Sequence, residues 1–262
     1  VEAGAKVLGM SKNIPTSPSH YELLELNKKI VSKKIDIQNL KKVKQTIKQF
    51  KPDFIFHLAA QSIVSKSYVN TIETWKTNLM GTVNILESLK QNNKEIVAVI
   101  ITSDKCYKNI ETKKGYTEND ILGGEDPYGA SKSAAEIAIN SYVKSFFLGK
   151  KNKNLIVSTR AGNVIGGGDW SDNRLIPDCV RSWNKEKAAK IRNPKSTRPW
   201  QHVLEVTYGY LLLAKTIKKN KKLHGESFNF GPNMKQNFKV IDILKKSKLF
   251  WKNIKWNIKK KD

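Results

Sequence analysis

A tyrosine and a lysine four positions apart, Tyr128 and Lys132, are the residues of this sequence whose types and spacing most directly suggest catalysis. They follow Pro127, which favours the first turn of a helix, so the spacing predicts that both side chains share one helix face. A protonated lysine beside a phenol stabilises the phenolate and lowers the pKa of the tyrosine. We therefore predict that Tyr128 exchanges protons with a substrate near neutral pH and that Lys132 supports it.

Three further polar residues, Ser103, Asp104 and Lys105, directly follow an apolar run of strand length over residues 96–102. Ligands of a parallel α/β sheet bind at the carboxyl ends of its strands. We therefore expect Ser103 near the substrate, with its hydroxyl placed to bind a substrate hydroxyl.

The elements that must position these residues alternate between strand and helix. Apolar runs of strand length span residues 5–9, 53–58, 96–102 and 155–159. Helical patterns span residues 40–50, 74–92 and 128–147. Continuous apolar strands between amphipathic helices are typical of a parallel sheet that is covered on both faces. We therefore predict an α/β fold of the Rossmann type, with a doubly wound parallel sheet.

The helical pattern over residues 74–92 carries a stripe with the three-to-four spacing of a buried face. Its members are Trp75, Leu79, Val83, Leu86 and Leu89. After Arg160, glycines and prolines break the chain into short pieces. We expect residues 1–160 to form a dinucleotide-binding domain. Residues 161–262 should form mainly a smaller substrate-binding lobe, with segments that return to the first domain.

The net charge of +25 would suit nucleic-acid binding, but its pattern does not. Nearly all of the positive charge is lysine scattered along the chain, and no helix-turn-helix, zinc-finger or RNA-binding motif is present. The arginines, whose planar fork suits base and phosphate recognition, are Arg160, Arg174, Arg181, Arg192 and Arg198. We therefore expect no nucleic-acid partner.

The composition also restricts the location of the protein and its metal content. No apolar run approaches the roughly 18 residues of a membrane span, so we expect no membrane partner. Two cysteines, Cys106 and Cys179, form no disulfide framework, and a cytoplasmic location is the simpler interpretation. His57 and His202 lack the spacing of metal ligands, and we expect no metal site.

Taken together, these motifs resemble the extended short-chain dehydrogenase/reductases. Residues 57–61 (His-Leu-Ala-Ala-Gln) resemble the loop beside the dinucleotide, and residues 77–82 resemble the helix segment whose asparagine stabilises the active site. Asp36 matches the acid that holds the adenine amino group. The resemblance implies that the cofactor is NAD. It implies cofactor contacts at Asp36, Ile37, Leu58, Ala59, Ala60, Gln61, Asn78, Thr102, Tyr128 and Lys132.

Within that superfamily, Asp104 and Lys105 resemble the acid–base pair of the sugar 4,6-dehydratases that act on CDP-glucose. The pair in sugar 4,6-dehydratases is usually Asp-Glu, and epimerases and decarboxylases usually lack it. Residues 160–170 and 197–205 are also similar to this branch. The resemblance implies a lyase in which Tyr128 takes the proton of the C4 hydroxyl, Lys105 removes the C5 proton and Asp104 protonates the departing C6 hydroxyl, before hydride returns to C6. It implies substrate contacts at Gln61, Ser103, Asn163, Arg174, Leu175, Arg198 and His202.

Two alternatives to this function stay open. The first is another dehydratase or an epimerase, acting on a dTDP- or GDP-sugar. The second, from a different class, is a catalytically inactive or basic binding fragment. The presence of all five polar residues of the catalytic set argues against an inactive remnant.

The sequence departs from the family in three respects. Family members begin with a strand and a Gly-x-x-Gly-x-x-Gly loop that holds the cofactor diphosphate, whereas this chain opens at what matches the second strand. We expect a chain truncated at both ends, with apolar surface exposed on the adjoining strand and little activity of its own. Asn13, beside Lys12, stands where an acid usually binds the ribose, which leaves NADP as an alternative to NAD. Since family members pair through two long helices, we expect a homodimer formed by residues 74–92 and 128–147.

Overall fold

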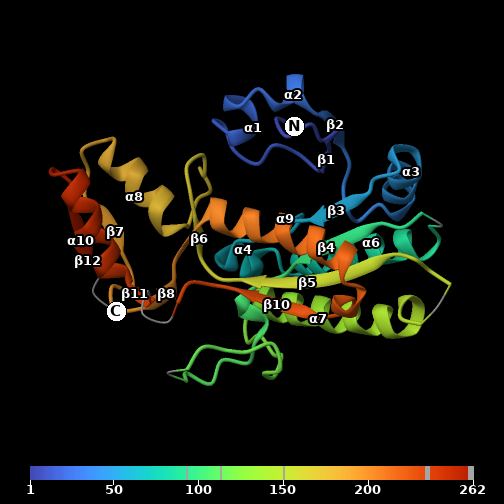
Figure 1. Cartoon of the computed structure of the whole chain (residues 1–262). Coiled ribbons are helices and arrows are strands. Elements are labelled where there is room, and N and C mark those ends of the chain that lie inside the picture. Colours follow the sequence, from blue (N-terminus) through green and yellow to red (C-terminus); the bar gives the residue numbers. More distant parts are fainter. Residues whose placement is uncertain (93, 113, 150, 234–236, 259–262) are drawn as a thin grey trace.

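The computed structural model describes residues 1–92, 94–112, 114–149, 151–233 and 237–258. Its centre is a parallel sheet with the strand order β10–β5–β4–β3 (Figure 1). The strands span Phe54–His57 (β3), Val97–Ile101 (β4), Leu155–Ala161 (β5) and Ser227–Phe230 (β10). The register places Val97 opposite both Phe54 and Leu155. The predicted doubly wound Rossmann-type class is confirmed.

The central strands are apolar because both faces of the sheet are covered. Ala98 and Ile100 of β4 face one core, with helices α6 and α7, whereas Val97 and Val99 face the other, with helix α9. These helices span Gly81–Lys90 (α6), Pro127–Tyr142 (α7) and Val203–Lys219 (α9). The strand therefore reads as a continuous apolar run although its side chains alternate between two cores.

Helix α3 (Leu40–Phe50) matches its sequence pattern in both bounds, but the pattern over residues 74–92 divides into three segments. These are α5 (Thr71–Trp75), a π-helical turn (Lys76–Met80) and α6. A π turn inserts a residue, which rotates the stripe that precedes it relative to the helix that follows. The expected buried stripe is thus only partly correct. Leu86 and Leu89 are buried, whereas Trp75, Leu79 and Val83 are half-buried.

Strands β1 (Leu8–Ser11) and β2 (Val31–Lys34) form a separate two-stranded parallel ladder, and β3 is the edge strand of the main sheet. The first strand thus begins three residues later than its sequence pattern. On the edge strand, Phe54 is 40% exposed, and Leu58, just beyond it, is 58% exposed. The expected apolar surface on the adjoining strand is therefore present. Two short helices, α1 (His20–Leu23) and α2 (Leu26–Lys29), connect β1 and β2.

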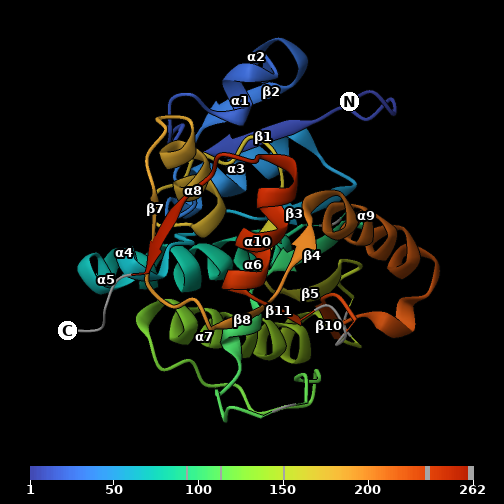
Figure 2. The ribbon, with the colours of Figure 1, turned by 90° about the vertical axis from the view of Figure 1, so that its left-hand side faces the viewer.

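Two parts of the chain after β5 pack around a third core, which lies beside the sheet in Figure 1 and faces the viewer in Figure 2. Cys179, Trp183, Leu244 and Ile254 are at its centre. Its elements are α8 (Leu175–Trp183), β7 (Ala189–Ile191), α10 (Val240–Phe250) and β12 (Trp256–Ile258). The small pairs β6–β9 and β8–β11 span Val164–Ile165 (β6), Gln201–His202 (β9), Thr197–Pro199 (β8) and Asn237–Lys239 (β11). Strand β10 and helix α9 return to the main sheet.

Helix α4 (Val64–Val69), a second π-helical turn (Val143–Phe147) that continues α7, and two 3₁₀ turns, Asp104–Cys106 and Lys221–Leu223, complete the described elements. Within the described ranges, no helix is long and apolar enough to cross a membrane.

Candidate active site

Helix α7 presents Tyr128 and Lys132 on one face, as their spacing predicts. The helix begins at Pro127, and the carboxylate of Asp126 caps it by accepting hydrogen bonds from the backbone N–H groups of Tyr128 and Gly129, each at 3.0 Å. Both side chains are buried, Tyr128 at 8% and Lys132 at 5% exposure. The Lys132 Nζ donates to the carbonyl oxygen of Ile101, at the carboxyl end of β4, at 3.1 Å. The helix is thus fixed against the end of the central strand.

The polar tripeptide forms a tight turn beside this helix. Ser103 follows β4 and caps the 3₁₀ turn. Its Oγ accepts from the Lys105 backbone N–H at 3.2 Å and donates to the Asp104 carboxylate at 3.1 Å. The Ser133 hydroxyl of α7 donates to the Cys106 carbonyl at 2.7 Å. The structure therefore brings the two sequence motifs together.

A glycine is required where α7 meets this turn. A Cβ added at Gly129 would lie 2.8 Å from the Lys105 carbonyl oxygen, closer than a real Cβ contact allows. The absence of a side chain at Gly129 lets the helix that carries Tyr128 approach the turn that carries Asp104 and Lys105.

The pKa of Tyr128 contradicts one expectation. Burial of the phenol raises its pKa, and the charge of Asp104 raises it further, whereas interaction with the Ser103 hydroxyl lowers it. The predicted lowering of the Tyr128 pKa is wrong for the protein alone, because burial of the phenol outweighs the interactions that lower this pKa. Burial lowers the pKa of Lys132 to about 8, so its charge is itself unfavourable there.

Asp104 has the electrostatics of a proton donor. Burial raises the pKa of its carboxyl, while Lys105, Ser103 and Arg198 oppose that shift. A raised pKa keeps a carboxyl protonated closer to neutral pH, which suits a general acid. The site is also tight: a Cβ at Gly162 would lie 3.2 Å from Asp104 Oδ2 and 2.5 Å from Pro199 Cγ.

The loop after β3 is held open toward solvent by a buried asparagine in the π turn. The Asn78 Oδ1 accepts from the Gln61 backbone N–H at 2.8 Å, and its Nδ2 donates to the Gln61 carbonyl at 3.0 Å and to the Ser131 hydroxyl at 2.9 Å. Leu58 and Ala59 are exposed on this loop and Ala60 is half-buried. Asn78 therefore connects the expected cofactor loop to the catalytic helix.

Three expected cofactor contacts have other partners in the structure. The Thr102 hydroxyl donates to the Glu136 carboxylate and to the Thr159 carbonyl. Ile37 is buried in the first core, where its side chain fills the space above Gly81.

The Asp36 carboxylate lies 3.2 Å from Lys12 Nζ and accepts from the Gln38 backbone N–H. Of these three residues, only Asp36 keeps an accessible polar side chain.

The arginines expected to bind substrate approach the catalytic residues from the second lobe. Arg174 donates to the Ser62 hydroxyl at 2.8 Å and pairs with Asp169 at 3.1 Å, and its charge lowers the pKa of Tyr128. The charge of Arg198 lowers the pKa of Asp104. The structure therefore brings both guanidinium groups close enough to lower the pKa values of Tyr128 and Asp104.

The three remaining residues that are expected to contact the substrate differ in their surroundings. Asn163 accepts from the Gln201 backbone N–H through its carbonyl, at 3.0 Å, which leaves its side chain available. Leu175 begins α8 and packs against the third core. His202 is exposed, and its Nδ1 accepts from the Leu204 backbone N–H as the N-cap of α9. This bond satisfies one of the free N–H groups at the start of the helix through Nδ1. The substrate contact expected for His202 stays a prediction.

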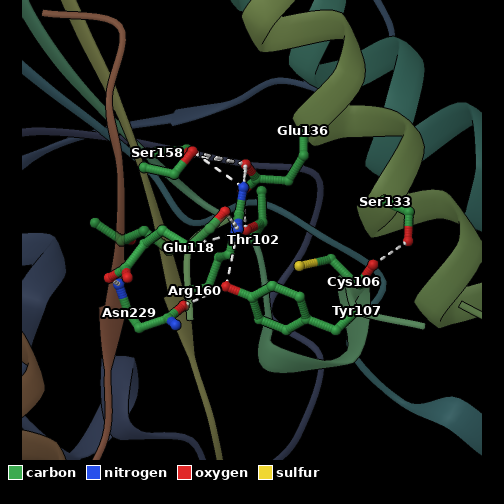
Figure 3. Close-up of polar contacts among 11 residues, drawn as sticks. Thr102, Cys106, Tyr107, Glu118, Ser133, Glu136, Ser158, Arg160 and Asn229 are labelled. Atoms are coloured by element: carbon green, nitrogen blue, oxygen red, sulfur yellow. Dashed lines mark hydrogen bonds and ion pairs between the residues drawn. The ribbon is translucent and has the colours of Figure 1, made fainter. Parts of the chain in front are cut away.

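Sequence reasoning missed a buried ion pair directly behind the site. Glu136 and Arg160 lie 2.8 Å apart and connect α7 to β5 (Figure 3). The available signal was that Glu136 lies four residues after Lys132, on the same face of the helix. Among the described residues, no group of three or more His, Cys, Asp or Glu could hold a metal ion.

Comparisons with known proteins agree with this geometry. A family model described as GDP-mannose 4,6 dehydratase matches residues 1–260. The chain is 44% identical over 253 residues to CDP-glucose 4,6-dehydratase from Salmonella typhimurium, which covers 95% of this chain and 70% of that protein. It is 28% identical to UDP-glucose 4-epimerase from Mycoplasma genitalium, over 80% of this chain and 65% of that protein.

Solved structures share the fold at lower identity. A dTDP-glucose 4,6-dehydratase from Bacillus anthracis in complex with NAD is 22% identical with a TM-score of 0.76, over 99% of this chain and 78% of that one. A UDP-glucose 4-epimerase from Thermotoga maritima with UDP-glucose is 18% identical with a TM-score of 0.80, over 99% of this chain and 80% of that one.

Proposed function

This chain belongs to the GDP-mannose 4,6-dehydratase family, and from that premise we propose that the protein is a CDP-glucose 4,6-dehydratase, a hydro-lyase. The observation that carries the proposal is the turn Ser103–Asp104–Lys105, held against the helix that presents Tyr128 and Lys132. An oxidation needs only Ser103, Tyr128 and Lys132, so the adjoining acid and amine are available for a second reaction, the elimination of water. The similarity to the Salmonella enzyme over 95% of the chain supports the same choice.

NAD is the cofactor that we propose. The open loop at Leu58 and Ala59 is fixed by Asn78, which also bonds Ser131 of the catalytic helix. These residues would hold the nicotinamide end of the cofactor. When bound, the nicotinamide supplies the hydride acceptor that an oxidation at C4 needs and the donor that a later reduction needs. We assign the contacts to Leu58, Ala59, Ala60, Gln61, Asn78, Tyr128 and Lys132, with Asp36 at the adenine.

The choice between NAD and NADP follows from Lys12. Its amine lies 2.8 Å from Glu73 and 3.2 Å from Asp36, and both carboxylates raise its pKa. A 2′-phosphate would need a cation that is free to pair with it. Since two carboxylates already neutralise Lys12, the ribose end favours a hydroxyl, as in NAD.

The first half of the reaction uses the residues of α7. The Tyr128 phenolate accepts the proton of the C4 hydroxyl, while the Ser103 hydroxyl orients that oxygen. A phenol with a raised pKa is a strong base once deprotonated, and interaction with the Ser103 hydroxyl stabilises the phenolate. We assign to Lys132 the support of this step from the next turn of α7. Oxidation at C4 produces a ketone that acidifies the C5 hydrogen.

The second half uses the turn. Lys105 removes the C5 proton, and Asp104 donates a proton to the C6 hydroxyl, which leaves as water with its C–O bond electrons. The raised pKa of Asp104 supports its role as the acid. Arg174 and Arg198, with Asn163 and Gln61, are assigned to the nucleotide diphosphate and the sugar, because a diphosphate presents many acceptor oxygens to guanidinium donors.

We further propose a homodimer. The two long helical stretches, residues 74–92 and 128–147, carry exposed apolar side chains: Met80 at 47%, Ile137 at 60% and Phe146 at 39% exposure. Apolar residues exposed along neighbouring helices indicate a helix-to-helix interface.

The lobe boundary that we propose, between residues 160 and 161, is supported by the separate third core. The buried free thiols of Cys106 and Cys179 support a reducing cytoplasm, where the product would enter deoxysugar synthesis for surface polysaccharides.

The test incubates the natural full-length protein with NAD and, separately, CDP-glucose, dTDP-glucose, UDP-glucose or GDP-mannose. Mass spectrometry should detect the loss of one water, as a 4-keto-6-deoxy sugar, from CDP-glucose alone. Water loss from a different nucleotide sugar would refute the nucleotide assignment. A C4 epimer without water loss would refute the dehydratase assignment.

A further inference from the structure

The ion pair between Glu136 and Arg160 is buried where the proposed mechanism has no use for it. Glu136 is 3% exposed and Arg160 5% exposed. Glu136 lies one turn beyond Lys132 and two turns beyond Tyr128 on α7, so the three side chains share one helix face. Figure 3 shows the arginine reaching from β5 to the helix carboxylate.

Each member of the ion pair bonds a residue next to one end of the turn Ser103–Cys106, which carries Asp104 and Lys105. The Glu136 Oε1 accepts from the hydroxyl of Thr102, which immediately precedes Ser103. The Arg160 NH1 donates at 2.8 Å to the hydroxyl of Tyr107, which immediately follows Cys106. The segment Ser103–Cys106 is therefore fixed at both ends to the same ion pair (Figure 3).

The other contacts make this attachment rigid. The second carboxylate oxygen of Glu136 accepts from Ser158 at 2.9 Å and from Ser227 at 3.2 Å, on strands β5 and β10. The Tyr107 hydroxyl donates to Asn229 at 2.7 Å, so β10 supports the second end as well. The turn is thus held in place by α7 and by the two strands β5 and β10.

Stability alone does not account for the pair. Removing two charges from water is costly, and a buried ion pair is often no more stabilising than apolar residues of similar volume. What the charged pair provides is a fixed geometry, with several directed hydrogen bonds. It also provides a negative charge near Lys132, which opposes the effect of burial on the pKa of that amine.

We propose that the Glu136–Arg160 pair is a positioning device for the elimination step: it holds Asp104 and Lys105 at their working distance from the sugar bound at Tyr128. This inference rests on the proposed function. C4 oxidation depends on Tyr128 and Lys132, which belong to α7 itself. Elimination depends on the turn, which must be held relative to α7. Loss of the pair should therefore slow elimination far more than oxidation.

The test compares Glu136→Gln with the wild-type full-length protein. A displacement of about 1 Å can reduce a rate on the order of a hundredfold, and we expect a loss of that size in water elimination. Rapid mixing should show that oxidation of the sugar, followed by absorbance of the reduced nicotinamide, is much less affected. The basic limb of the pH–rate profile should also move to lower pH, because Lys132 loses a nearby negative charge.

Asn154→Ala is the matched control. Asn154 is 1% exposed and lies at the amino ends of β4 and β5, far along the strands from the site. Its side chain accepts a hydrogen bond from the Ile96 N–H and donates one to the Leu89 carbonyl. Its loss should destabilise the fold without changing the ratio of the two rates. An equal loss of both rates in Glu136→Gln, or the same change of ratio in Asn154→Ala, would overturn the proposal.

A second readout needs no substrate. Amide hydrogen exchange over Asp104–Tyr107 should be faster in Glu136→Gln than in the wild type and unchanged in Asn154→Ala. If Glu136→Gln fails to fold, Tyr107→Phe removes one attachment and keeps the ion pair, and it should change the exchange and the rate ratio in the same direction. Unchanged exchange would refute the positioning role, whereas absence of wild-type water loss would refute the proposed function instead.

Discussion

Replacing Lys132 by methionine should stabilise this protein while abolishing its catalysis, and the gain should depend on pH. Burial lowers the pKa of Lys132 from 10.5 to about 8. Since one pH unit corresponds to about 1.4 kcal/mol, the buried charge opposes folding by about 3 kcal/mol. Methionine keeps the unbranched stem and removes the charge, but it leaves the Ile101 carbonyl without its donor, which costs about 1–3 kcal/mol.

The pH dependence separates these two contributions. Because the folded-state pKa is lower than the unfolded-state pKa, the folded protein binds fewer protons between about pH 8 and 10.5, so wild-type stability rises with pH through that window. The charge penalty is complete below about pH 8. It amounts to about 3 kcal/mol at about pH 7 and about 1 kcal/mol at about pH 10. The lost hydrogen bond does not follow this curve.

The assay is urea unfolding of the wild type and Lys132→Met at both pH values. The difference in unfolding free energy should change by about 2–3 kcal/mol in favour of the wild type as the pH rises. Other titrating groups are common to both proteins and cancel in the difference. Lys219→Met, at an exposed position on α9, is the control and should show no such change. A pH-independent difference for Lys132→Met would refute the buried-charge reasoning.

Three further predictions concern the site and its surroundings. In the full-length protein, Asp104→Asn should slow water elimination by about 10²- to 10⁴-fold while C4 oxidation persists, because only the second step needs the acid; rapid-mixing kinetics separate the two steps. Gly162→Ala should lower kcat on the order of a hundredfold, because the added Cβ would lie 2.5 Å from Pro199 Cγ and would force a shift of the segment beside Asp104; an unchanged kcat would refute the need for a glycine there. Ile137→Glu should convert a dimer into a monomer in sedimentation velocity, because a charge would be buried at the proposed interface; Lys219→Glu, away from that face, should leave the dimer intact.

The sequence pattern predicted those parts of the fold that depend on residues close together in the chain. Helix α3 matches its sequence pattern from Leu40 to Phe50, because its apolar residues recur at helical spacing. Tyr128 and Lys132 share a face because four residues make about one turn. Ser103 lies beside them because β4 ends at Ile101 and parallel strands present their carboxyl ends to one edge.

The errors have long-range causes. The direction of the Tyr128 pKa depends on burial, which arises only when α7 packs on the sheet. Glu136 and Arg160 pair across 24 residues of sequence, which no spacing rule connects. The π turn at Lys76–Met80, which rotates the apolar stripe, has no composition signal in this sequence.

The central claim is that one active site oxidises C4, eliminates water and reduces C6 of the same sugar. The most direct measurement uses CDP-glucose with deuterium at C4, incubated with the full-length protein and NAD. We expect a CDP-4-keto-6-deoxyglucose product in which mass spectrometry and NMR find the deuterium at C6. Deuterium retained at C4 in an epimer, or a deoxy product without the label at C6, would contradict it.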